Sequence, residues 1–187
     1  MAQDKQPNTT DLLVEAAWAT LEELGFTAQR KRSRSRIWEI SGALNGETIQ
    51  GTASVRTTQD RWFAFPPLPN GWKTLDDVDY VIVSAVDNTD HPKQAEVYLF
   101  PAEEVRHRFD EAYEARTKAG QVVTEGFGMW VALDRGSTGV ADVGSGLAED
   151  YGKLDKRPLR TRRSDDVPAA ASAAIDAGSP RPSVGVR

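Results

Sequence analysis

Five positively charged residues fall between positions 30 and 36, in the run RKRSRSR. If this run is a β-strand, Arg30, Arg32, Arg34 and Arg36 share one side, because successive side chains of a strand point to opposite faces. Guanidinium groups bind phosphate oxygens through charge-assisted hydrogen bonds, so this side would contact successive phosphates of a nucleic acid. The predicted phosphate-binding residues are Arg30, Lys31, Arg32, Arg34, Arg36 and Arg56. A solvated edge strand that its charge protects from aggregation is the alternative.

A second basic group follows near the end of the chain, and consists of Lys153, Lys156, Arg157, Arg160, Arg162 and Arg163. Residues 153–187 carry a net charge of +4, which leaves −9 for residues 1–152, since the whole chain carries −5. This group is a nucleic-acid-binding arm, a segment that contacts the acidic body, or a segment that contacts neither. An acidic body also excludes a protein that coats nucleic acid over its whole surface.

Carboxylates surround the apolar run from Tyr80 to Val86. Asp76, Asp77 and Asp79 precede it, Asp87 and Asp90 follow it, and Glu96 begins the next apolar segment. Two or three converging carboxylates can bind Mg²⁺ for phosphodiester cleavage. Turn and cap positions explain the same residues without a metal, so we expect no cofactor, with Mg²⁺ as the alternative. The chain has two histidines and no cysteine, which disfavours His-dependent triads and excludes thiolate chemistry.

The elements that must position these residues follow from apolar spacing and local stop signals. A helix is predicted from Thr9 or Thr10, as N-cap, to about Leu24, and a second one from Pro101 to Lys118. Asn45-Gly46 indicates a hairpin, and strands are predicted over 47–58, 80–86 and 95–100, with a short one over 129–133. We therefore expect a single α/β or α+β domain with a mixed central sheet and flanking helices.

Composition sets the outer limits of that domain in the 187-residue chain. We predict a flexible lead over 1–8, the domain over 9–134, a glycine-rich linker over 135–151 and a disordered basic tail over 152–187. An aromatic cluster, Trp62, Phe63, Phe65 and Trp72, is expected to cover the core rather than to stack on bases. The sequence contains no apolar run of membrane-spanning length and no apolar signal core, so we expect no membrane partner and a cytoplasmic location.

Several segments together resemble the restriction-endonuclease-like PD-(D/E)XK superfamily. They are TDLLVEAAWATLEELGF, IWEISG, ASVRTTQDRWFAF, DDVDYVIVSAVD and EVYLFPAEEV, and they cover about residues 10–118. The resemblance implies a nuclease-like fold with Glu39 at the position of the metal-binding aspartate. It also places Ser54 and Arg56 where the family has an acidic ligand and a lysine. Serine is a poor Mg²⁺ ligand and arginine is a poor general base, so the resemblance implies a degenerate site.

The leading hypothesis is a nuclease-like DNA-associated accessory or regulatory protein without catalysis, which contacts phosphates through its arginines. An active Mg²⁺-dependent nuclease that uses Glu39, Arg56, Asp79 and Glu96 is the second hypothesis. A third is an acidic module that binds a partner protein and no nucleic acid, which the charge of −9 on the body favours.

Overall fold

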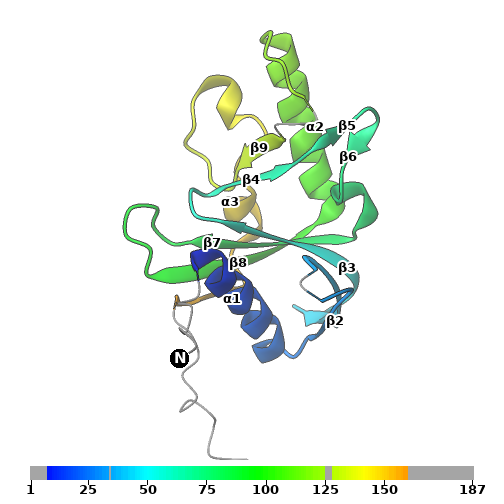
Figure 1. Ribbon diagram of the computed structural model, residues 1–187, viewed down its shortest axis with the longest axis vertical. Helices are drawn as coiled ribbons and strands as arrows, with labels where there is room; N and C mark the ends of the chain where they lie inside the picture. Colours follow the sequence, from blue (N-terminus) through cyan, green and yellow to red (C-terminus); the bar gives the residue numbers. More distant parts are fainter. Residues whose placement is uncertain (1–7, 34, 125–127, 160–187) are drawn as a thin grey trace, which may run out of the picture.

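The computed structural model describes residues 8–33, 35–124 and 128–159. Figure 1 shows the order of its elements along the chain. They are α1 (Thr9–Glu23), β1 (Thr27–Arg30), β2 (Ile37–Leu44), β3 (Glu47–Thr58), β4 (Trp62–Phe65), β5 (Pro67–Leu68), β6 (Gly71–Trp72), the 3₁₀ helix η1 (Leu75–Asp77), β7 (Tyr80–Val86), β8 (Gln94–Pro101), α2 (Ala102–Lys118), β9 (Met129–Ala132), the 3₁₀ helix η2 (Gly139–Asp142), α3 (Leu147–Tyr151) and β10 (Asp155–Pro158). No helix in the described ranges is long and apolar enough to cross a membrane.

A mixed six-stranded sheet, in the order β1-β2-β3-β7-β8-β10, forms the centre of the fold. Neighbouring strands are antiparallel, except that β3 and β7 run parallel. A parallel pair cannot be joined by a tight turn. The chain makes this connection through β4, β5, β6 and η1. The prediction of an α/β domain with a mixed central sheet and flanking helices is confirmed.

Each face of the sheet packs against its own layer, with α1 on one side and α2, β4 and β9 on the other (Figure 1). We call these the α1 face and the α2 face. On the α1 face, Leu13, Ala17 and Leu21 of α1 pack on residues such as Trp38 and Ile82. The core of the α2 face includes Phe63, Phe65, Trp72, Val81, Val83, Phe100 and Phe109. Phe63, Phe65 and Trp72 are therefore core residues, as predicted, whereas Trp62 of the same predicted cluster is half-buried and lies outside this core.

The register of β3 and β7 determines which β3 side chains belong to the α2 face. Ser54 pairs with Val81 and Arg56 pairs with Val83, and both valines belong to the core of that face. Directly paired residues of neighbouring strands point to the same side. Ser54 and Arg56 consequently point toward the layer that contains β4, β9 and α2.

Local signals explain most of the element boundaries. Asn45 and Gly46 both have positive φ, at 52° and 84°, as the two-residue hairpin between β2 and β3 requires. Gly25 has φ +80° directly after α1, in agreement with the predicted stop. The N-cap differs from the prediction of Thr9 or Thr10, because the Oδ1 atom of Asn8 accepts the bond from Asp11 N at 2.9 Å. Asparagine is at least as good an N-cap as threonine.

The prediction of a strand over residues 30–36 is wrong. β1 ends at Arg30 and β2 begins at Ile37, and the described residues between them, 31–33 and 35–36, form a loop. The loop is closed by bonds from Lys31 N to the Ile37 carbonyl and from Ile37 N to Ser35 Oγ. A segment without apolar residues has no face to bury in the sheet, and serine bonds readily to nearby backbone groups. Arg34 lies outside the described residues.

The predicted boundaries near the end of the chain also need correction. Residues 155–158, placed in the disordered tail, form β10 and pair with β8 as the last strand of the sheet. The stretch 135–151, predicted as a linker, contains η2 and α3, and its Leu147 is fully buried. Ion pairs hold this end, including those of Lys153 with Glu96 and of Arg157 with Glu23. The rest of the predicted tail, 160–187, and residues 1–7 of the predicted lead lie outside the described residues.

Candidate anion-binding site

Arg56 is a mostly buried cation on the α2 face of β3. Its guanidinium carbon lies 4.1 Å from the centre of the Phe65 ring, which β4 carries over that face. Its Nε atom is buried without a hydrogen-bond partner, although most buried polar groups in proteins have one. Burial, and then the nearby charge of Arg36, lower the pKa of Arg56 to about 10. The fold therefore keeps a positive charge in a position that is unfavourable for the free protein.

Arg36 lies beside Arg56 because β2 begins only at Ile37, which pairs with Ser54. The next residue of β3, Val55, therefore lies beside the β1–β2 loop and not beside β2. Its backbone N–H donates to the carbonyl of Arg36 at 2.7 Å. Burial lowers the pKa of Arg36, Asp11 raises it and Arg30 lowers it further. Arg30 in turn lies 5.6 Å from the ring of Trp18. We call Arg30, Arg36 and Arg56 the arginine cluster.

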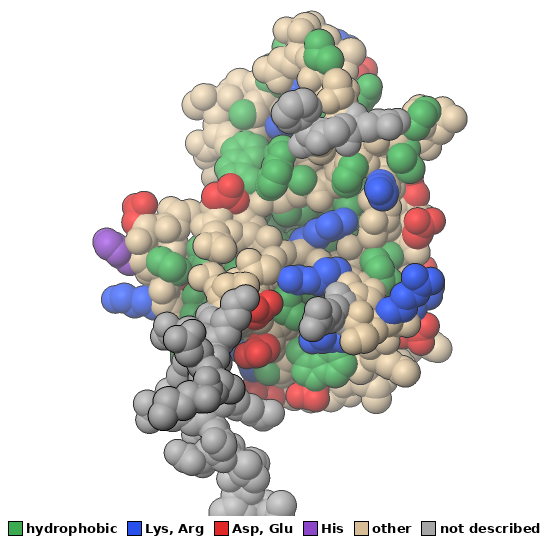
Figure 2. Space-filling model, viewed as in Figure 1, with side chains coloured by type: hydrophobic (Ala, Val, Ile, Leu, Met, Phe, Trp, Pro, Cys, Tyr) green, Lys and Arg blue, Asp and Glu red, His purple; other side chains and the backbone are tan. Residues whose placement is uncertain are grey.

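No carboxylate in the described ranges forms an ion pair with the arginine cluster. Eight other cationic side chains of the same ranges have such partners, namely Arg61, Arg106, Arg108, Lys118, Arg135, Lys153, Lys156 and Arg157. Figure 2 shows the basic side chains gathered over β3 and the β1–β2 loop, next to hydrophobic ones. Like charges repel at short range, so a bound anion would stabilise this arrangement.

The other predicted phosphate-binding residues lie in or near the same loop. Lys31 and Arg32 are exposed, and Ser35 N donates to the Arg32 carbonyl at 2.9 Å, which makes this part of the loop a turn. The basic residues of this segment therefore do not alternate along an extended strand in the way that the sequence predicted. The structure thus brings together Arg30, Arg36 and Arg56, with Lys31 and Arg32 on the connecting loop, by a different route from the one predicted.

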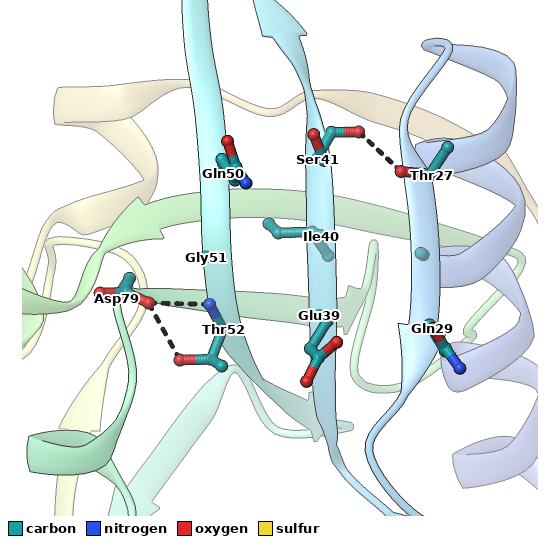
Figure 3. A pocket seen from close by; sticks show the side chains of 10 residues that line it. Thr27, Gln29, Glu39, Ile40, Ser41, Gln50, Gly51, Thr52 and Asp79 are labelled. Carbon is teal, nitrogen blue, oxygen red and sulfur yellow. Dashed lines mark hydrogen bonds between the residues drawn. The ribbon is translucent and has the colours of Figure 1, made fainter.

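Two of the predicted carboxylates line an open groove of about 620 Å³ on the α2 face of β1, β2 and β3 (Figure 3). Glu39 projects from β2, whereas Asp79 approaches from the segment before β7. The Oδ2 atom of Asp79 accepts hydrogen bonds from Thr52 N at 2.8 Å and from Thr52 Oγ1 at 3.0 Å. The remaining polar side chains are those of Thr27, Gln29, Ser41 and Gln50. This groove carries negative charge and repels phosphate.

Glu96 does not join Glu39 and Asp79. It lies on β8, where it is ion-paired with Arg61, Lys153 and Lys156 and accepts a 2.8 Å bond from the hydroxyl of Tyr98. By itself burial would raise the pKa of Glu96, but the bonds from Lys153 and Tyr98 and the charges of Arg61 and Lys153 lower it to about 2. Among the described residues, no three His, Asp or Glu side chains are close enough to hold a metal ion. The three predicted nuclease carboxylates therefore do not converge, because Glu39 and Asp79 share a groove that Glu96 does not line.

The described basic residues near the end of the chain contact the acidic body, which was one of the three predicted possibilities. Lys153 and Lys156 pair with Glu96, and Arg157 pairs with Glu23 and Asp155. Their charges are neutralised within the fold. Arg160, Arg162 and Arg163 lie outside the described residues.

Comparison with known proteins returns no match to a family model, a curated protein or a solved structure. The relationship to the PD-(D/E)XK superfamily remains a prediction, and the site has to be interpreted from its own chemistry. At the positions that carry the resemblance, the Oγ atom of Ser54 is buried without a partner, two residues before Arg56 on the same face of β3.

Sequence reasoning missed two further groups of polar residues. Arg61 donates to Asp134, Glu96, Tyr98 and the Val86 carbonyl, and so connects β4 with β7, β8 and the end of β9. Arg116 on α2 donates to the Trp130 carbonyl at 2.7 Å. Both contacts join residues far apart in the chain, so no local pattern indicates them. The alternation in WFAF and MWVA was the available signal that Trp62 and Trp130 lie opposite the core.

Proposed function

We propose that this protein binds the phosphate backbone of DNA through the arginine cluster, and acts as an accessory or regulatory protein rather than as a nuclease. The observation that carries the proposal is Arg56, a desolvated guanidinium without a carboxylate or a hydrogen-bond partner at its Nε atom. Phosphate oxygens are the acceptors that match such a fork of donors best.

Two further features support a local contact with a polyanion. Arg36 and Arg30 extend the positive charge from Arg56 to the edge of the sheet, and Lys31 and Arg32 continue it on the exposed loop. The neighbouring groove with Glu39 and Asp79 is acidic, and would confine phosphates to the arginine side. The separation of Glu96 from that groove supports binding without metal-dependent cleavage.

The salt dependence of binding tests the proposal. Three phosphate contacts predict that log affinity for duplex DNA falls with log salt with a slope of about −2.7, at roughly −0.9 per contact. Arg36→Ala should flatten this slope by about 0.9. Fluorescence anisotropy with a labelled 20-base-pair duplex measures both values.

Arg157→Ala is the matched control, because it removes an equal charge from an arginine that is already ion-paired with Glu23 and Asp155. Its slope should equal that of the wild type. If Arg36→Ala and Arg157→Ala bind with the same slope, or if the wild type does not bind DNA, the arginine cluster is not a phosphate site.

A further inference from the structure

The outer side of the β4–β9 pair carries two tryptophans that the core does not use. Trp62 pairs with Ala132, and Trp130 pairs with Ala64, so the two indoles are diagonal neighbours on one face. The opposite face carries Phe63, Phe65, Met129 and Val131, which are all nearly or fully buried. Trp130 is 47% exposed and Trp62 is partly exposed. We call Trp62 and Trp130, with Ala64 and Ala132 between them, the tryptophan platform.

Exposure of the tryptophan platform to water is energetically unfavourable. Each indole is large and apolar, and the alanines beside them are too small to cover them. Diagonal neighbours in an antiparallel pair lie roughly 7–8 Å apart, within reach of large side chains. This arrangement offers two aromatic faces to flat rings that approach from solvent.

Cations without carboxylate partners lie along the same pair of strands. Phe65 of β4 pairs with Met129 of β9. Arg56 lies against the Phe65 ring, whereas Arg116 donates to Met129 Sδ at 3.0 Å and to the Trp130 carbonyl at 2.7 Å. Arg116 has no ion pair with a described residue, and burial lowers its pKa. Phe65 and Met129 belong to the buried face of this pair, so Arg56 lies beneath the pair, and Arg116 reaches the edge of the tryptophan platform at the Trp130 carbonyl.

We propose that the tryptophan platform stacks the bases of single-stranded nucleic acid while the arginine cluster and Arg116 hold its phosphates. The inference rests on the proposed function and specifies its substrate as a single strand. Aromatic side chains beside a positively charged track are the combination that binds unpaired strands, because every base has a stacking face. In a duplex the bases are stacked on one another and offer no face to a flat surface.

Charge distinguishes this occupant from a second copy of the chain. Two copies that met through the tryptophan platform would each place Arg116 at the edge of the interface, because its guanidinium donates to the Trp130 carbonyl. The described residues near Trp130 supply no carboxylate that pairs with Arg116. Like charges that face each other across an interface disfavour self-association. A polyanion with aromatic bases satisfies both the charge and the apolar surface.

Two fluorescein-labelled oligonucleotides of twenty units separate stacking from phosphate binding. One is oligothymidylate, and the other is an abasic strand that has the same phosphates and no bases. The wild type should bind oligothymidylate more tightly than the abasic strand. Trp130→Ala should weaken oligothymidylate binding about 5- to 150-fold, the range for loss of one stacked base, and leave the abasic strand unaffected. Trp130→Phe should restore much of the affinity, because a phenyl ring still stacks.

Leu24→Ala is the matched control, since Leu24 is an exposed apolar residue at the end of α1, on the other side of the sheet. It should bind both strands as the wild type does. Equal binding of the two strands, unchanged by Trp130→Ala, would overturn the stacking inference and leave the phosphate proposal standing. Absence of binding to either strand would overturn both. A wild type that dimerises in sedimentation, with a monomeric Trp130→Ala variant, would show that a second copy covers the platform and would also overturn the inference.

Discussion

Replacement of Arg56 by methionine should make the free protein more stable, although it removes the centre of the proposed binding site. Methionine keeps most of the apolar contact with Phe65 and removes the charge. The pKa of Arg56, about 10, is well below the pKa of an ordinary arginine guanidinium. At about 1.36 kcal/mol per pKa unit, this corresponds to roughly 3 kcal/mol against the charged, folded form.

The measured gain should be smaller than this figure. Arg56 keeps some contact with solvent, and its attraction to the Phe65 ring contributes roughly 1 kcal/mol that the variant loses. We therefore expect Arg56→Met to raise the free energy of unfolding by about 1–2 kcal/mol. For a chain of this size, that is a rise in Tm of about 2–8 °C. Thermal and urea unfolding, followed by circular dichroism, measure both quantities.

Arg61→Met provides the contrast, since Arg61 is an arginine whose partners are all present. Its guanidinium serves Asp134, Glu96, Tyr98 and the Val86 carbonyl, so its removal leaves buried groups without partners. We expect a loss of about 3–5 kcal/mol. Both residues are replaced by the same side chain, so the sign of the change reports whether the charge is compensated. A lower Tm for Arg56→Met than for the wild type would refute the reasoning, because it would mean that the fold itself satisfies Arg56.

Two further predictions concern the end of the chain and the response to acid. A chain that ends at Gly152 should have a Tm several degrees lower than one that ends at Leu159. Only the longer chain keeps β10 and the ion pairs of Lys153, Lys156 and Arg157. Equal Tm values for the two chains would contradict the assignment of β10. Because the folded pKa of Glu96 is lowered to about 2, its ionisation stabilises the fold above about pH 4.5. This contribution, roughly 2–3 kcal/mol, should vanish as pH falls from 4.5 to 2, and Glu96→Gln should flatten that part of a stability-versus-pH curve measured by urea unfolding; an unchanged curve would show that Glu96 is not responsible.

The sequence predicts the parts of the fold that apolar periodicity and local signals determine. The strands over 80–86 and 95–100 and both long helices have their own apolar pattern, and Asn45-Gly46 defines a hairpin at short range. β10 has no such pattern, because its four residues DKRP are polar or proline and are held by β8 and by ion pairs. A strand of this kind depends on partners that are distant in sequence, so composition alone suggests disorder.

The candidate site shows a similar division. The density of arginines predicts a positively charged site, but the strand expected over 30–36 would have placed the charges differently. The cluster forms because the β1–β2 loop ends beside Arg56, a contact that depends on the register of β2 and β3. The separation of Glu96 from Glu39 and Asp79 follows from the strand order, since Glu96 lies on β8, beyond β3 and β7 from β2. Spacing in the sequence does not contain this information.

The most direct measurement of the central claim follows the guanidinium of Arg56 itself. The Nε–H group of Arg56 is visible in ¹H–¹⁵N spectra of the arginine side chains, and its peak is assigned by its loss in Arg56→Met. When a twenty-nucleotide single strand is added, we predict that the Arg56 peak shifts, because a phosphate bound to the guanidinium changes the electrostatic environment of its Nε–H. The Arg61 peak, whose Nε–H already donates to Asp134, should stay in place. If the strand binds and the Arg56 peak does not move, the arginine cluster is not the anion site.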